Sequence, residues 1–150
     1  MDTTSEPAPG SDMAKAPTWV PAEHLSDVQV GSTRWQSYFE FLAVLLVLMT
    51  WARPNECLCI LGDNSSSLTN AVQIKGKRSM ARVARELAWR KAREGWRYVV
   101  GHLPTEVNSV ADALSRLAEP TPAPLPPGLS RVPRIQAPAV RDLWRIPILE

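Results

Sequence analysis

The pattern of hydrophobic and polar positions predicts a helix followed by a strand in the first half of the chain. From residue 35 to residue 49 apolar side chains recur at helical spacing and then become continuous, which is typical of a buried helix. Pro54 is expected to end this helix. The segment Glu-Cys-Leu-Cys-Ile-Leu at 56–61 is short, apolar and bounded by turn residues, which predicts a buried strand of a parallel sheet.

The second half of the pattern predicts two more helices, a second strand and a final short helix. Serines at 65–67 are expected to cap the first of these helices, and Ser79 an amphipathic helix that ends at Gly95. Residues 96–102 are rich in aromatic and β-branched side chains and predict a strand. Asn108 then caps the short helix. The order helix, strand, helix, helix, strand, helix indicates an α/β fold with a right-handed crossover.

Proline content sets the expected domain boundaries. Residues 1–33 are polar, contain several prolines and have no periodic apolar pattern, so we expect them to be disordered or poorly ordered. Residues 119–150 form a proline-rich tail, and proline excludes regular structure over most of it. The folded part is therefore expected at 34–118, a small domain of marginal stability.

Charge is concentrated in one segment although the net charge is only +2. Between Lys75 and Arg97 there are nine basic and two acidic residues, a local net charge of +7. Such a segment is either the solvated face of a helix or a surface that contacts the phosphate backbone of nucleic acid, without reading its sequence. For the second alternative the candidate residues are Lys75, Lys77, Arg78, Arg82, Arg85 and Arg90.

The cysteines and the apolar run bear on the cellular compartment. We expect Cys57 and Cys59 to point to opposite faces of their strand, to stay reduced and to hold no zinc, as is usual in an intracellular protein. The continuous run at 41–49 is shorter than the roughly 20 residues that span a bilayer. We therefore expect no membrane contact and a location in the cytoplasm or nucleus; the alternative is a membrane helix over 35–52.

Three carboxylates occupy positions where chemistry is possible. Glu40 lies inside the apolar helix, Asp63 follows the first strand, and Asp112 lies in the first turn of the last helix. Sites in α/β sheets form beyond the carboxyl ends of the strands, and converging carboxylates attract hard cations such as Mg²⁺. Each residue also has a structural alternative, since Asp63 suits a turn and Asp112 suits a helix N-terminus. His102 is a strand-end histidine that could assist proton transfer.

A set of ordered motifs resembles the ribonuclease H domain of retroelement reverse transcriptases. The segment His102-Leu103-Pro104, then Asn108, then Ala-Asp-Ala-Leu-Ser-Arg at 111–116 is similar to the end of that domain. Phe-Glu-Phe-Leu-Ala-Val at 39–44 resembles its first helix, and Leu-Gly-Asp-Asn at 61–64 its fourth strand with the acidic residue that follows.

The resemblance implies a mixed five-stranded sheet with helices and two-metal cleavage of the RNA strand of RNA–DNA hybrids. It makes Glu40, Asp63 and Asp112 the expected Mg²⁺ ligands and catalytic residues. It also implies nucleic acid, and other parts of a polymerase polyprotein, as partners.

One part of the family pattern has no counterpart in this chain. The family begins with three strands, the first of which carries another metal-binding aspartate. Asp2, Asp12 and Asp27 lie in polar or proline-rich surroundings without the alternation of a strand. We therefore expect a partial, N-terminally truncated ribonuclease H-like fold that lacks the first three strands and is inactive.

Overall fold

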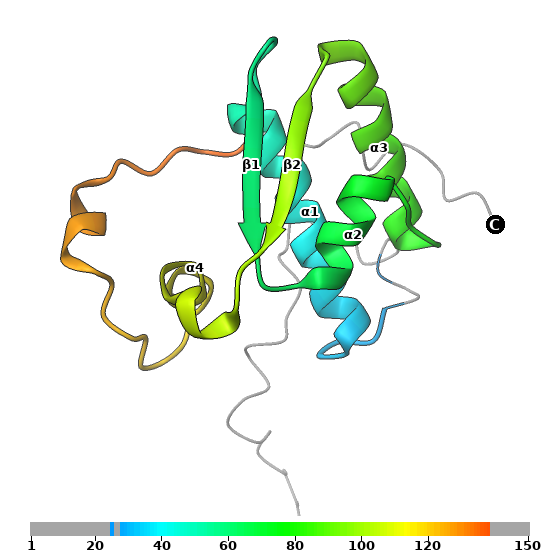
Figure 1. Cartoon of the computed structure of the whole chain (residues 1–150). Helices are drawn as coiled ribbons and strands as arrows, with labels where there is room; N and C mark the ends of the chain where they lie inside the picture. The colour runs from blue at the N-terminus through cyan, green and yellow to red at the C-terminus, as the bar shows by residue number, and fades with distance from the viewer. Residues whose placement is uncertain (1–24, 26–27, 139–150) are drawn as a thin grey trace, which may run out of the picture.

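The computed structural model describes residues 25 and 28–138, and it confirms the mixed α/β class over this part of the chain (Figure 1). Four α-helices and two strands follow one another in the expected order. The predictions for residues 1–24, 26–27 and 139–150, including those for Asp2, Asp12 and Asp27, lie outside the described residues. The elements are α1 (Thr33–Trp51), β1 (Cys57–Gly62), α2 (Ser65–Gln73), α3 (Ser79–Glu94), β2 (Arg97–His102) and α4 (Ser109–Ser115), with 3₁₀ turns at Thr105–Val107 and Pro127–Arg131.

The two strands form a parallel pair, as the helical connection between them requires. Their register runs from Cys57 opposite Arg97 to Gly62 opposite His102. One bond continues the pairing beyond the strands, because the N–H of Leu103 donates to the carbonyl oxygen of Gly62 at 2.8 Å. The carboxyl ends of both strands therefore meet at one end of the sheet. Asp63 is the first residue after β1 at this end.

The core lies between α1, α2, α3 and the inner face of the sheet. In Figure 1, α1 passes behind the strands, with α2 and α3 beside it. Helix α1 supplies most of the fully buried large side chains, and Leu25 joins the same cluster from before the helix. From the sheet, Leu58, Ile60 and Tyr98 pack against this cluster. The buried members from α1 are Tyr38, Phe41, Leu42, Val44, Leu45 and Leu48.

Two side-chain hydrogen bonds connect α2 to its neighbours. The hydroxyl of Ser67 donates to the carbonyl oxygen of Ser37 in α1 at 3.0 Å, in a buried environment. The hydroxyl of Tyr98 in β2 donates to the carbonyl oxygen of Ala71 at 2.6 Å. Burial also raises the pKa of Tyr98, so this hydroxyl remains a donor well above neutral pH. Helix α2 is thereby fixed to both the longest helix and the sheet.

The outer face of the sheet departs from the sequence prediction. Strand β1 alternates exposed and half-buried residues, so it is buried on one face only. Cys57 and Cys59 are both exposed and share the outer face, and the expectation that they point to opposite faces is wrong. Residues two apart in a strand lie on the same side, which is the rule that the prediction misapplied.

The helix caps agree with the sequence prediction at the end of α3 but differ from it at the starts of α2 and α3. Gly95 ends α3 in the left-handed conformation, as expected. Helix α2 is capped by Asn64, whose side chain accepts from the N–H of Ser67, and not by the serines themselves. Ser79 is the first residue of α3 and is buried, while the N-cap is Arg78 without a side-chain cap bond. Asn108 occupies the N-cap of α4 but makes no side-chain cap bond.

Substitution of Leu45 by alanine tests the central role of α1. Leu45 is 0% exposed, and removing a buried leucine side chain costs about 2–5 kcal/mol through lost burial and the cavity it leaves. Leu114→Ala is the matched control, because Leu114 on α4 is 43% exposed and should cost less than about 0.5 kcal/mol. Urea unfolding followed by circular dichroism measures both, and equal losses would contradict the assignment of the core.

Candidate functional site

Glu40 and Asp63 are brought together by the packing of α1 beneath β1. Glu40 lies in the second turn of α1 and is half-buried. Asp63 follows Gly62, the last residue of β1, at the carboxyl end of the sheet. Burial raises the pKa of Glu40, and the negative charge of Asp63 raises this pKa further. The two carboxylates are thus near enough to repel each other.

Asp112 belongs to a separate part of the surface. It lies on the exposed side of α4, and its Oδ1 is 3.1 Å from Nε of Arg116, one helical turn later. Among the residues that the structure describes, no group of three or more His, Cys, Asp or Glu side chains could hold a metal ion. The structure therefore pairs Glu40 with Asp63 and leaves Asp112 with Arg116.

His102 occupies the same end of the sheet as the carboxylate pair. It is the last residue of β2, it is exposed, and it lies opposite Gly62, the neighbour of Asp63. This places an imidazole near the region where Asp63 leaves the sheet. Within the described residues, no hydrogen bond or ion pair joins the His102 side chain to either carboxylate, so its assisting role stays a prediction.

The donor chemistry of Glu40 and Asp63 suits one hard cation. Two converging carboxylates supply oxygen ligands, and a divalent ion between them would offset the repulsion that raises the pKa of Glu40. A two-metal centre needs more anionic oxygen ligands to bridge and balance both ions. Within residues 25 and 28–138, the carboxylate pair supplies fewer ligands than a two-metal centre needs.

Most cations of α3 are engaged within the protein. Arg82 is 4% exposed and lies on the side of α3 that faces the core. Nε of Arg90 is 2.6 Å from Oε1 of Glu86, and Nε of Arg85 donates to the carbonyl oxygen of Ala81 at 3.4 Å. The prediction of a nucleic-acid surface is therefore wrong for Arg82, because it is buried, and it is weakened for Arg90, because an acidic partner compensates its charge.

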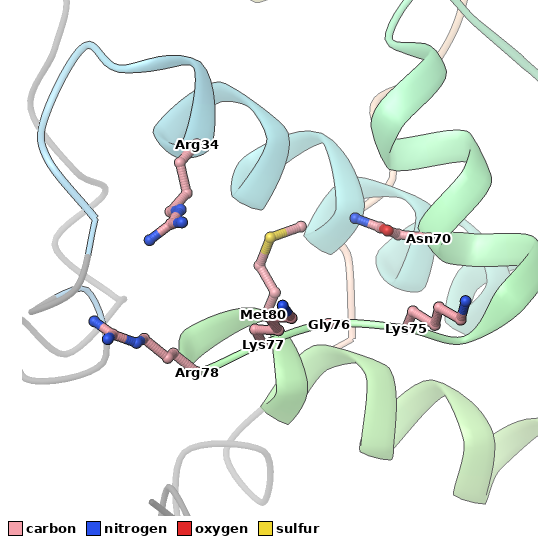
Figure 2. Close-up of a pocket in the computed structure, with 7 residues that line it drawn as sticks. All are labelled: Arg34, Asn70, Lys75, Gly76, Lys77, Arg78 and Met80. Carbon is pink, nitrogen blue, oxygen red and sulfur yellow. The ribbon is translucent and has the colours of Figure 1, made fainter.

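Three exposed cations, Lys75, Lys77 and Arg78, lie on the loop between α2 and α3, which we call the basic loop (residues 75–78). With Arg34 they line a hollow of about 530 Å³. Figure 2 shows Arg34 reaching down from the first turn of α1 while Met80 rises toward it from α3. The lining contains no acidic residue and consists of Arg34, Asn70, Lys75, Gly76, Lys77, Arg78 and Met80.

The conformation of the basic loop holds it against the start of α3. Ile74, which precedes the loop, and Arg78, its last residue, have positive φ values of 50° and 53°, which non-glycine residues rarely adopt. A Cβ atom on Gly76 would lie 2.5 Å from the backbone of Met80, so only glycine allows this close approach. The first turn of α3 is bonded to the loop through its backbone, because the N–H groups of Met80 and Ala81 donate to the carbonyl oxygens of Lys77 and Arg78 at 3.1 and 3.0 Å.

A second hollow lies on the other side of the same loop. It measures about 410 Å³, and Arg85 lines it together with Lys75 and Lys77. The basic loop is thus accessible from both sides. Of the six predicted nucleic-acid contacts, Lys75, Lys77, Arg78 and Arg85 surround these hollows. Arg34 adds to them from more than forty positions earlier in the sequence, a proximity that no local pattern indicates.

Comparisons with known proteins do not identify a family or a function for this chain. No protein family matches the chain, and no curated protein or solved structure matches it either. Within the described residues, no helix has the length and apolar character needed to cross a membrane. The apolar side chains of α1 instead pack against α2, α3 and the sheet.

An NMR titration of the Glu40 carboxyl tests the carboxylate pair. Asp63→Asn should lower the pKa of Glu40 by removing the negative charge, while leaving it above the ordinary value of 4.5 because burial persists. Asp112→Asn is the matched control and should leave the pKa of Glu40 unchanged. An equal response to both variants would show that Asp112 also approaches Glu40.

The same shift makes folding stability depend on pH. An acid whose pKa is raised in the folded state binds its proton more tightly there, so the free energy of unfolding falls as pH rises from 4.5 through the raised value. Glu40→Gln should remove this loss and stabilise the protein at neutral pH, with the gain shrinking toward pH 4.5. Urea titrations at a series of pH values measure it, and a gain independent of pH would contradict the sign.

Proposed function

We propose that this chain is a ribonuclease H-like element of a retroelement polymerase polyprotein that binds the phosphate backbone of nucleic acid and does not cleave it. The observation that carries the proposal is the hollow formed by Arg34 and the basic loop, with four cations and no acidic residue in its lining. The motif resemblance at 39–44, 61–64 and 102–116 supplies the kind of ligand, an RNA–DNA hybrid.

The chemistry of the hollow suits phosphate groups. The Arg34 and Arg78 guanidinium groups can each form paired hydrogen bonds to phosphate oxygens, and Lys75 and Lys77 add compact charges. Such contacts recognise the backbone and do not distinguish base sequences.

The absence of cleavage is proposed from the acidic residues. Glu40 and Asp63 would hold one Mg²⁺, which when bound acts as a Lewis acid toward a phosphoryl oxygen. Asp112 is engaged by Arg116, so the described residues offer two carboxylates where in-line displacement by two metals needs more. A binding module unrelated to ribonuclease H would share the basic loop but would have no use for the Glu40–Asp63 pair.

The first test is a cleavage assay. The purified chain, incubated with a fluorescently labelled RNA–DNA hybrid in Mg²⁺, should give no cleavage above a protein-free sample. Robust cleavage that Asp63→Asn abolishes would overturn the proposal that the chain is inactive. Cleavage that survives Asp63→Asn would instead indicate a contaminating nuclease.

The second test measures binding to the same hybrid by fluorescence anisotropy across a range of salt concentrations. Each phosphate contact contributes roughly 0.7–0.9 to the slope of log affinity against log salt. A triple alanine variant of Lys75, Lys77 and Arg78 should therefore weaken binding and reduce the slope by about 2.

The control for this test keeps the net charge equal. Arg53, Arg131 and Arg134 are exposed and lie away from the lining of both hollows. Their triple alanine variant lowers the charge by the same amount, so it should leave most of the affinity intact. Equal losses in the two variants would show that net charge, and not the hollow, drives binding.

A further inference from the structure

Helix α3 carries an exposed aromatic side chain between two basic ones, outside the lining of the first hollow. Arg85, Trp89 and Arg93 follow one another at intervals of one helical turn, so they lie on one face of α3 and each neighbours the next. Trp89 is 52% exposed. A large aromatic surface therefore meets solvent between two cations. We call these three residues the α3 stripe.

The indole ring of Trp89 is held in place by Arg93. The guanidinium carbon of Arg93 lies 4.7 Å from the centroid of the ring, which is within the range of a cation–π contact. Nε of Arg93 is also 3.2 Å from Oε1 of Glu94, and both side chains of this ion pair are exposed. An exposed ion pair contributes little free energy, so a phosphate group can replace Glu94 as the partner of Arg93.

The α3 stripe begins at the second hollow of the basic loop. Arg85 lines that hollow together with Lys75 and Lys77, and no acidic residue belongs to its described lining. Within the described residues Arg85 makes one side-chain hydrogen bond, from Nε to the carbonyl oxygen of Ala81. The two terminal nitrogens of its guanidinium group can thus donate to phosphate oxygens. The second hollow and the α3 stripe form one basic surface that leads from the loop to Trp89.

We propose that the α3 stripe binds a single-stranded segment of nucleic acid, with one base stacked on Trp89 and phosphates bound by Arg85 and Arg93. This inference rests on the proposed function and specifies the form of nucleic acid that this surface takes. Bases inside a duplex are covered on both faces by their neighbours, whereas an unpaired base can stack on an aromatic ring. Aromatic side chains set among basic groups are the usual means of binding single strands.

The dimensions of the α3 stripe agree with this form of ligand. Arg85 and Arg93 are separated by two helical turns, about 12 Å along the helix axis, a distance that a few nucleotides span. The basic loop can then hold the hybrid while the adjoining single strand lies along α3. Trp89 should consequently add affinity for a single-stranded tail and not for the duplex itself.

The experiment compares two fluorescently labelled RNA–DNA hybrids, one with blunt ends and one with a single-stranded tail of about ten adenosines. Fluorescence anisotropy should show that the whole chain binds the tailed hybrid more tightly. Trp89→Ala should weaken binding of the tailed hybrid about fivefold or more and binding of the blunt hybrid less than about twofold. Because this substitution removes no charge, it should leave the slope of log affinity against log salt unchanged.

Two further variants separate stacking from general effects of substitution. Trp89→Phe keeps an aromatic ring and should retain most of the preference for the tailed hybrid. Trp51→Ala is the matched control, because Trp51 is 50% exposed, ends α1 and lines neither hollow. It should leave both affinities within about twofold of the unsubstituted chain.

The possible results distinguish this inference from the proposed function. The inference is overturned by equal binding of the two hybrids, by a Trp89→Ala variant that weakens both equally or neither, or by equal losses in Trp89→Ala and either further variant. After any of these results the proposed function still stands if the triple alanine variant of Lys75, Lys77 and Arg78 weakens binding of both hybrids and lowers the salt slope. If that triple variant has no effect, the proposed function and this inference fail together.

Discussion

The burial of α1 is the interaction on which the rest of the structure depends. Its apolar side chains meet α2 and α3 on one side and the inner face of both strands on the other. A parallel pair of two short strands has too little surface to be stable by itself. The sheet, and with it the position of Asp63, therefore exists because α1 provides an apolar surface against which the strands can pack.

The same helix fixes both candidate sites. Arg34 in its first turn reaches the hollow at the basic loop, and Glu40 in its second turn approaches Asp63. The acidic pair and the basic hollow thus each include a residue of the same helix, α1. Electrostatically, the chain presents a negative site and a positive site whose separation is set by the rise of a helix and not by loop geometry.

The parts of this structure that follow local rules could be predicted from the sequence. The order of elements, the parallel pairing and the glycine at the end of α3 all result from periodicity or from the conformational preference of a single residue. The ion pairs Glu86–Arg90 and Asp112–Arg116 could also have been predicted from the sequence, since each spans one helical turn. Both pairs make Arg90 a weaker candidate for nucleic-acid contact and Asp112 a weaker candidate for metal binding. Arg34 and the burial of Arg82 depend on how separate helices pack, which no local pattern contains.

Helix α4 differs from the other helices in how little holds it. Ala113 is its one buried residue, whereas Val110 and Leu114 are exposed. Local opening requires little free energy where few apolar contacts are lost. The segment that follows Leu103 can consequently detach and reattach while the core stays folded. Among the helices of the described residues, a protease would cut at α4 before it cuts the core, and it would leave α1, the sheet and the basic loop as a resistant fragment, separated from Asp112.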